Sequence, residues 1–387
     1  MTNKPLLSNG NPNESDGSST DSKNRDNREA WSNNWQFIFS ALAYCVGLGN
    51  IWRFPYLCAQ SGAGAFLIPY FLITAIMGTS LLYTEIALGQ MTQKGVVGAF
   101  SFLKKQLPGV GHASMMIIFL LSSYYVAVVA WGLKYLTISL IYLGRELPWQ
   151  NGTTEREYWE NNILQKTSGI EESGGIIFSN LIFLVLIWIG IFLTIIKGKR
   201  IMAKVAETCV TIPYFILLLL LVITMSTNGS ELGISYFITP RWDQLKSVTV
   251  WQNAAVQVFN SIGIACGSMV VYGSFVPEKN TDLLKNTFII VGLNCFTSIL
   301  AGFVIFAAIG NISYAGRKIS KIIFYSWFLF LRTCVFATGK DVTEIAAEGV
   351  DLLFVVYPKV FTLFGHWGSL LSCISGLATV EEIRFGI

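Results

Sequence analysis

Long apolar stretches, separated by short polar segments, run through most of the chain. After about 30 polar residues, apolar segments lie at about 35–60, 65–89, 113–144, 176–196, 205–225, 251–275, 284–310 and 365–387. Each can reach the roughly 20 residues that a membrane-spanning helix requires. The pattern therefore predicts an all-α integral membrane protein.

Two of these segments are interrupted. In the first, the run GLGNIWRFPY at Gly47–Tyr56 places two glycines, an amide, a charge and a proline among apolar residues. Each glycine costs a helix about 1 kcal/mol relative to alanine, and Pro55 removes a backbone donor. Backbone groups freed inside a bilayer must face protein or a water-filled cavity, so the break indicates an ion or solute site. The 251–275 segment is interrupted in the same way, and the two broken segments head successive groups of spans, as in transporters built from repeats.

The composition supports a membrane protein and argues against several other classes. Of 387 residues, 53% are hydrophobic and 13% are charged, with mean hydropathy +0.54. The net charge of +4 comes without a basic cluster interleaved with aromatics, so no nucleic-acid partner is expected. No GxxxxGK loop, CxxC pair or histidine cluster is present. Free thiols are expected, because the cysteines all lie in apolar segments: Cys45, Cys58, Cys209, Cys266, Cys295, Cys334 and Cys373.

The charges of the short loops predict the orientation. Residues 1–34 are polar and predict a disordered cytoplasmic tail, and 35–387 form the transmembrane domain. Loops 90–112 and 197–204 carry several lysines and an arginine, so both are expected in the cytoplasm. The loop at 145–175 is then extracellular, and its Asn151-Gly152-Thr153 is a glycosylation acceptor. We expect a multi-pass plasma-membrane protein with a cytoplasmic N-terminus.

One stretch fits this scheme poorly. Residues 316–339 are apolar but short, and Arg332 interrupts them. A true span, a re-entrant or surface segment, and a spurious insertion from a retained intron are the three interpretations. A ninth span here would reverse the orientation of everything after it.

The broken segment belongs to a series of motifs. GLGNIWRFPY is followed by GAGAFLIPY, TEIALGQ around Glu85, YYVAVVAW at Tyr124–Trp131, LPW at Leu147–Trp149, TIPY at Thr211–Tyr214, the run from Val250 to Gly267, and NCFTSILAGFVIF at Asn294–Phe306. This order resembles the neurotransmitter:sodium symporter family, the sodium- and chloride-dependent transporters of amino acids, GABA and monoamines. The resemblance covers about 30–310 and resumes near 345. It implies an inverted-repeat fold of twelve helices with helices 1 and 6 broken, of which this chain holds about eight.

The resemblance implies two sodium sites. The first would use the carbonyl of Cys45 with side-chain oxygens of Asn50, Ser261 and Asn294. The second would use backbone and side-chain oxygens of Ala43, Val46, Ser375, Ala378 and Thr379. Ala378 lacks the side-chain oxygen that many relatives have there. The alternative for Asn50 and Asn294 is hydrogen bonding between helices without an ion.

A chloride site is implied as well. The family positions around the ion read Tyr70, Gln257, Ser261, Asn294 and Ser298, and each can donate a hydrogen bond to an anion. No carboxylate replaces Ser298, as it does in chloride-independent relatives. Ordinary bonding between helices by small polar groups is the alternative.

The substrate class depends on Gly47, where monoamine carriers have an aspartate. A glycine leaves room for a substrate that brings its own carboxylate, which the resemblance places against the Tyr125 hydroxyl. Relatives usually have an aromatic residue at the position of Asn260, so this amide points to a more polar substrate or to altered transport. The residues implied to contact the substrate are Gly47, Gly49, Leu121, Tyr125, Asn260, Gly263 and Cys266.

Two charges complete the candidate site. Arg53 is expected at the outer mouth, where relatives pair it with an aspartate on the tenth helix, beyond the end of this chain. Glu85 is costly in hydrocarbon unless it is paired, and we expect it to accept hydrogen bonds from the broken backbone of helices 1 and 6.

These observations favour a secondary symporter and not an enzyme. Sodium would drive inward transport of an amino-acid-like solute, with chloride offsetting charge; glycine, proline, GABA, taurine and larger neutral amino acids all remain open. The alternatives are a truncated, non-transporting form that binds a full-length partner, a channel and, last, a membrane enzyme. The expected partners are the solute and the lipid bilayer, with a homo-oligomer left open.

Overall fold

The computed structural model describes residues 30–47, 49–143, 145–149, 155–169, 171–172, 174–196, 199–277 and 282–327, together with Phe354 and Pro358. These residues are mostly helical and contain no β-strand. Five helical segments are long and apolar enough to cross a membrane: Gly64–Thr92, Pro108–Ile141, Phe178–Ile196, Lys204–Met225 and Leu283–Tyr314. A bent pair, Asn34–Cys45 with Gly49–Gln60, forms a sixth candidate, and the all-α membrane architecture is confirmed.

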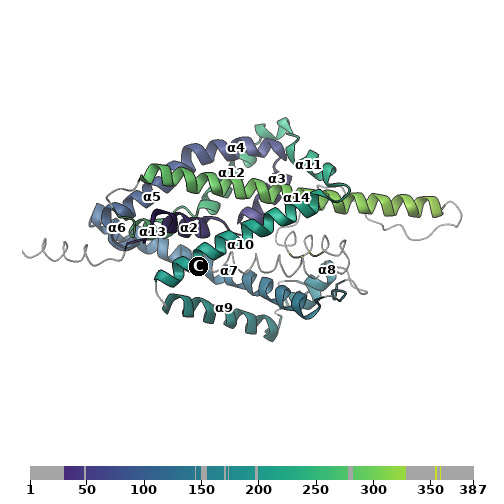
Figure 1. The fold of residues 1–387 in the computed structure, drawn as a ribbon, viewed down its shortest axis with the longest axis horizontal. Helices are drawn as coiled ribbons and strands as arrows, with labels where there is room; N and C mark the ends of the chain where they lie inside the picture. The colour runs from purple at the N-terminus through teal and green to yellow at the C-terminus, as the bar shows by residue number, and fades with distance from the viewer. Residues whose placement is uncertain are drawn as a thin grey trace, which may run out of the picture.

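The helices lie roughly along the long axis of the molecule (Figure 1). The segment Gly64–Thr92 is built from α4 (Leu67–Ile73), a π-helical part (Thr74–Gly78) and α5 (Thr79–Thr92). The other long helices are α7 (Pro108–Ile141), α9 (Phe178–Ile196), α10 (Lys199–Met225) and α14 (Leu283–Trp327). α9 lies beside α7 at the lower edge of the view (Figure 1).

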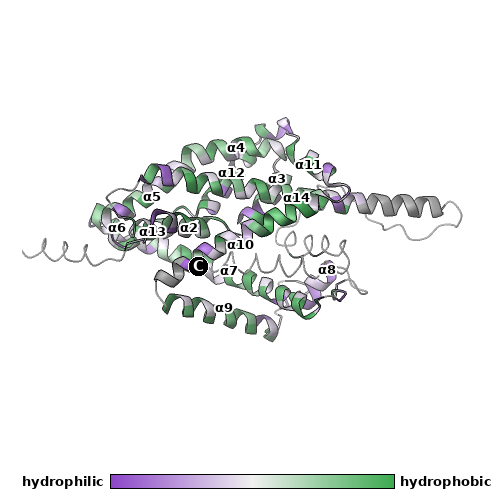
Figure 2. Ribbon diagram, in the orientation of Figure 1, coloured by the Kyte–Doolittle hydropathy of each residue, from purple (hydrophilic) through white to green (hydrophobic). Residues whose placement is uncertain are grey.

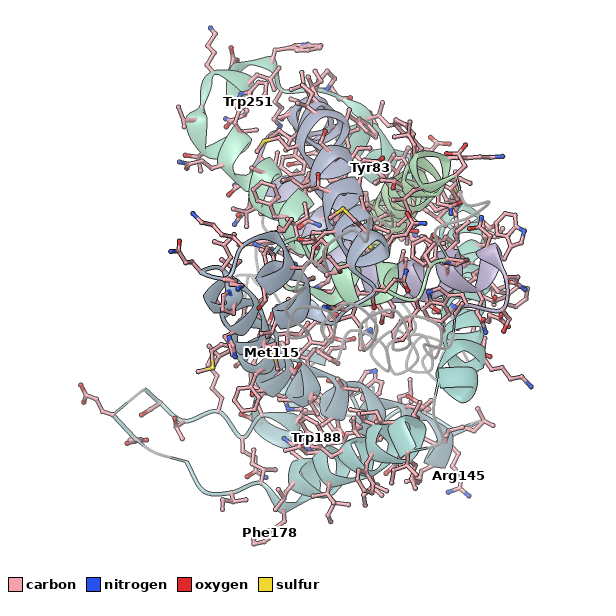
Figure 3. All side chains as sticks on the ribbon, turned by 90° about the vertical axis from the view of Figure 1, so that its left-hand side faces the viewer. Tyr83, Met115, Arg145, Phe178, Trp188 and Trp251 are labelled. Carbon is pink, nitrogen blue, oxygen red and sulfur yellow. The ribbon has the colours of Figure 1, made fainter. Side chains whose placement is uncertain are left out.

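Hydrophobic residues predominate along the long helices throughout the molecule (Figure 2). Tyr83, Met115, Phe178 and Trp188 are 38%, 54%, 74% and 45% exposed, and Figure 3 shows Phe178 at the lower edge of the molecule. Among the residues of α9, Ile191 alone is buried within the described structure. Such a surface is suited to lipid, because a bilayer solvates apolar side chains that water does not.

Both predicted helix breaks are present. The first lies between α2 (Asn34–Cys45) and a π-helical turn (Gly49–Arg53) that leads into α3 (Phe54–Gln60), and the chain bends there by 55°. The second separates α12 (Val248–Ile262) from α13 (Ser268–Gly273). Pro55 stands in the first turn of α3, where its missing N–H needs no helical partner.

Glycines let two pairs of helices approach through their backbones. A Cβ at Gly89 of α5 would overlap the carbonyl of Val270, and one at Gly273 of α13 would overlap the carbonyl of Ile86. The same close approach joins α14 to α11 (Ser230–Ile238), where a Cβ at Gly310 would lie 2.6 Å from the backbone nitrogen of Gly233. α13, the part of the second broken helix that follows the break, is therefore packed tightly on α5.

Some boundaries differ from those that hydropathy predicts. The expected cytoplasmic loop 90–112 contains α6 (Val96–Leu103). α14 continues to Trp327, past the predicted end of its apolar segment near 310, because helix hydrogen bonds do not require apolar side chains. The short helix Glu155–Glu157 with a π-helical turn (Tyr158–Ile163) lies in the predicted outer loop.

Several predictions lie outside the described residues. They concern the tail at 1–29, the glycosylation site Asn151, the segment 365–387, and residues 328–339 of the unusual stretch at 316–339, of which only the backbone to Trp327 is described. Of the cysteines, Cys45, Cys58, Cys266 and Cys295 are free thiols in the described structure, as expected.

Candidate functional site

The first break interrupts the helical hydrogen bonds of the backbone between α2 and the π-helical turn at Gly49–Arg53. α2 ends at Cys45, and Val46 turns to an extended conformation (φ −89°, ψ 102°) while its N–H still bonds to the carbonyl of Leu42. The Asn50 N–H then donates to the carbonyl of Gly47 at 2.9 Å. The helix resumes only after this turn, so the backbone between Val46 and Asn50 leaves the regular helical pattern.

The second break is held by left-handed residues. Gly263, Ala265 and Gly267 have φ of 68°, 69° and 78°. Glycine is needed at 263 for a second reason, because a Cβ there would lie 2.5 Å from the Tyr44 hydroxyl. Ala265 carries the strain of a left-handed backbone without being glycine, and its N–H donates to Glu85 Oε1 at 2.7 Å.

A cavity of about 690 Å³ lies where the two breaks meet α7. All seven residues implied to contact a substrate line it, although they come from three separate parts of the chain: Gly47, Gly49, Leu121, Tyr125, Asn260, Gly263 and Cys266. Cys45, Asn50, Arg53 and Ser261 line it as well. The structure thus brings the predicted substrate residues together.

Two polar side chains lie against the glycines of the first break. A Cβ built at Gly47 would be 3.0 Å from the Tyr125 hydroxyl, and one built at Gly49 would be 3.3 Å from Asn260 Nδ2. Any larger residue at Gly47 would therefore press on Tyr125. The glycine opens the space between the unwound backbone and α7, which is the space that a small solute would need.

A network of buried amides and a hydroxyl joins the first break, α12 and α14. Asn50 Nδ2 donates to Asn294 Oδ1 at 2.6 Å, and Ser261 Oγ donates to Asn50 Oδ1 at 2.7 Å. Asn294 Nδ2 donates to Ser261 Oγ at 2.8 Å. All three side chains are buried. Their oxygens gather within hydrogen-bonding distance of one another, a donor set that suits a hard cation such as sodium.

The predicted chloride residues continue this network toward α4. The Tyr70 hydroxyl donates to Ser298 Oγ at 3.3 Å, and Ser298 Oγ donates to the carbonyl of Asn294 at 3.3 Å. Gln257 Nε2 donates to the carbonyl of Gly49 at 3.0 Å, while its Oε1 is buried without a partner among the described residues. Buried hydroxyl and amide donors from three helices surround this position, which is suited to an anion once the Gln257 amide turns its Nε2 toward it.

Glu85 and Arg53, the two charged residues of the predicted site, have few polar partners among the described residues. Glu85 accepts a hydrogen bond from the second break, and its Oε2 is buried without a partner in the described part of the chain. No hydrogen bond from the first break to Glu85 is seen among the described residues. Arg53 lines the cavity and forms no ion pair with a described carboxylate. The residues Ser375, Ala378 and Thr379 lie outside the described structure, so only Ala43 and Val46 of the second sodium site can be placed.

Sequence reasoning missed part of the cavity wall. Trp52, Tyr56 and Tyr124 line the cavity beside the predicted residues, as do Tyr44 and Phe259. Tyr44 and Phe259 directly precede the predicted residues Cys45 and Asn260. Adjacent residues near the end of a helix lie only about 100° apart around its axis, so both can border a wide cavity. The neighbours of the predicted residues were therefore the available signal.

Comparisons with known proteins agree with this architecture. A model described as the sodium:neurotransmitter symporter family matches residues 28–155 and 150–375. The "Sodium- and chloride-dependent transporter XTRP3" of Rattus norvegicus is 33% identical over 359 residues, covering 88% of this chain and 57% of the relative. The "Creatine transporter" of Torpedo marmorata is 32% identical, covering 87% and 55%, and the "Sodium- and chloride-dependent GABA transporter ine" of Drosophila melanogaster is 30% identical, covering 86% and 35%.

A solved structure shares the fold. The crystal structure of MhsT in complex with L-phenylalanine superposes with a TM-score of 0.72 at 23% identity, covering 93% of this chain and 72% of that one. The chain spans about half the length of the curated relatives it matches. The relatives are named as transporters, not enzymes, as the sequence predicts. The matched residues, the identities and the two broken helices together show that this chain belongs to the sodium:neurotransmitter symporter family.

Proposed function

We propose that this chain is a sodium-driven, chloride-dependent symporter for an amino acid or a similar small zwitterion. The observation that carries the proposal is the placement of the buried Asn50–Ser261–Asn294 network directly against a cavity lined by both helix breaks. An ion and a solute bound there would share the turn of backbone between Gly47 and Asn50. The names of the relatives support the same class, because they include a creatine transporter and two transporters described as sodium- and chloride-dependent, one of them for GABA.

Sodium would enter the first site by replacing hydrogen bonds that the network now makes within itself. The carbonyl of Cys45 and the side-chain oxygens of Asn50, Ser261 and Asn294 would supply its ligands. A second ion would use the carbonyls of Ala43 and Val46 with Ser375, Ala378 and Thr379. A membrane potential contributes about 2.3 kcal/mol per charge per 100 mV to such transport.

Chloride would lie among Tyr70, Gln257, Ser261, Asn294 and Ser298. Its proximity to the first sodium ion would reduce the cost of holding that ion's charge in a low-dielectric interior. Gln257 is the residue that must rearrange, because its Nε2 is engaged with Gly49 in the structure described here.

The solute would lie along the first break with its carboxylate at the Tyr125 hydroxyl. Unpaired backbone N–H groups at a helix break favour an anion, and the first sodium ion would add a positive charge nearby. Leu121, Gly263 and Cys266 would shape the remainder of the pocket, with Arg53 at its outer mouth and Glu85 beneath the second break.

The loop charges orient the protein in the plasma membrane. Lys94, Lys104 and Lys105 flank α6 on the side that we assign to the cytoplasm, together with the N-terminus. The loop at 145–175, with its acceptor Asn151, would face outside.

The test is uptake into liposomes reconstituted with the purified chain. A labelled panel of amino acids, GABA and creatine is offered under an inward sodium gradient, with potassium in place of sodium and gluconate in place of chloride as controls. Accumulation that requires both ions supports the proposal. Sodium-dependent binding without accumulation would instead favour the non-transporting form, and the absence of any sodium-dependent binding would refute the proposed site.

A further inference from the structure

Asn260 is an exposed polar group beside apolar residues of the cavity wall, and it has no hydrogen-bond partner among the described residues. It lies on α12 three residues before the second break, and its side chain is exposed to the cavity. No hydrogen bond joins its amide to any described residue, although the amide can donate two hydrogen bonds and accept two. Val256, Phe259 and Ile264 supply the neighbouring wall.

The amide also has a defined position relative to the proposed carboxylate site. Asn260 Nδ2 lies 3.3 Å from where a Cβ at Gly49 would be, and the Tyr125 hydroxyl lies 3.0 Å from where a Cβ at Gly47 would be. Gly47 and Gly49 are two residues apart, so their Cα atoms are separated by at most about 7 Å. A solute whose carboxylate lies at Tyr125 would therefore reach Asn260 with a group a few bonds away.

We infer that Asn260 determines substrate specificity and that it selects amino acids whose side chain carries a neutral hydrogen-bonding group, such as a hydroxyl or a carboxamide. This inference rests on the proposed function, because it assumes that an amino acid binds in this cavity. An aliphatic side chain of the same shape would displace water from the amide and leave it without a partner. A hydroxyl or carboxamide would replace that water.

The size of the preference follows from the strength of one neutral hydrogen bond. Such a bond contributes a factor of about 5 to 10 in affinity. Pairs of amino acids with nearly equal shape isolate it: threonine against valine, and asparagine against leucine. In each pair we expect the polar member to bind about 5 to 10 times more tightly.

The experiment measures binding by the purified full chain in detergent, because binding does not require a transport cycle. Thermal stabilisation as a function of ligand concentration gives the dissociation constant of each amino acid, in sodium chloride and in potassium chloride. The variant Asn260→Leu removes both donors and acceptor at similar size. Asn253→Leu makes the same chemical change seven residues earlier on α12, at an amide that bonds to Ser61 Oγ and does not line the cavity. Asn260→Gln tests whether an amide alone restores the preference.

The results separate the inference from the proposed function. The inference is supported if the polar member of each pair binds more tightly than the apolar member to the native chain and to Asn253→Leu. In Asn260→Leu that difference should disappear, while the affinities for valine and leucine stay unchanged. Sodium-dependent binding with no polar preference, or with a preference that survives in Asn260→Leu, overturns the inference and leaves the proposed function standing. If no amino acid of the panel stabilises the native chain in sodium, both fail.

Discussion

Gly47 provides the sharpest test of the proposed carboxylate site. A Cβ atom built on Gly47 would lie 3.0 Å from the Tyr125 hydroxyl. In Gly47→Asp the new carboxylate would start from that Cβ, within about 4 Å of a solute carboxylate bonded to Tyr125. Two like charges at about 4 Å repel each other by about 4 kcal/mol at an effective dielectric constant of 20, so the variant should bind zwitterions about a thousandfold more weakly.

Two further variants separate charge from size. Gly47→Ala adds the Cβ alone, and its loss of affinity measures the steric contact with Tyr125. Gly95→Asp is the control, because a Cβ at Gly95 meets nothing within 4 Å and the residue is the N-cap of α6, where aspartate is favoured. This variant should bind zwitterions as tightly as the native chain does. The charge effect is the difference between Gly47→Asp and Gly47→Ala.

The assay is equilibrium binding of labelled amino acids to the purified protein, followed by competition with amines that lack a carboxylate. Gly47→Asp should lose zwitterions and gain relative affinity for the amines, because its carboxylate can pair with an ammonium group. Zwitterion affinity within tenfold of that of Gly47→Ala would refute the reasoning. The carboxylate would then have to lie elsewhere in the cavity.

Three other outcomes follow from the same structure. Gly310→Ala should destabilise the protein by about 1–3 kcal/mol, because its Cβ would overlap α11. Gly292→Ala lies on the same helix with nothing within 4 Å of its Cβ, so it should be neutral or stabilise by up to about 1 kcal/mol. Thermal unfolding in detergent compares the two variants. Asn294→Leu removes the side-chain oxygen that accepts from Asn50 and that we propose as a sodium ligand, so it should abolish the stabilisation that sodium gives. Retention of the full sodium effect would contradict the ion site. Ala265→Gly relieves a left-handed backbone and should stabilise by about 1 kcal/mol, which a lower unfolding midpoint would contradict.

The local chemistry of the chain made the two breaks predictable. Gly47, Gly49 and Pro55 weaken a helix by known amounts, and polar groups in hydrocarbon require a partner, so a site could be expected before any fold was known. The resemblance then named the residues of the cavity wall, and all seven substrate candidates line one cavity.

Features that depend on contact between distant segments could not be predicted. Tyr44 lies against Gly263, which is 219 residues away, and this contact adds to the need for glycine there. The length of α14 differs from that of its apolar run for another reason, although the run at 284–310 predicts the candidate span Leu283–Tyr314. The apolar run stops near residue 310, but the helix continues because its hydrogen bonds are made by the backbone and not by side chains. Hydropathy locates the part of a helix that suits a membrane, not the helix itself.

The arrangement at Asn50 has a thermodynamic consequence for the proposed symport. Asn50 belongs to the buried network through its side chain, and its N–H bonds to the carbonyl of Gly47, which faces the cavity. An ion that binds the amide oxygen would therefore fix the same turn that a solute contacts. If sodium raises the affinity for the solute by some factor, thermodynamic linkage requires that the solute raise the affinity for sodium by the same factor. Such factors are commonly about 5- to 150-fold. Equal factors in the native chain, both reduced to one in Asn294→Leu, would show that the coupling passes through this network. A solute affinity independent of sodium would mean that the two sites, although adjacent, do not communicate.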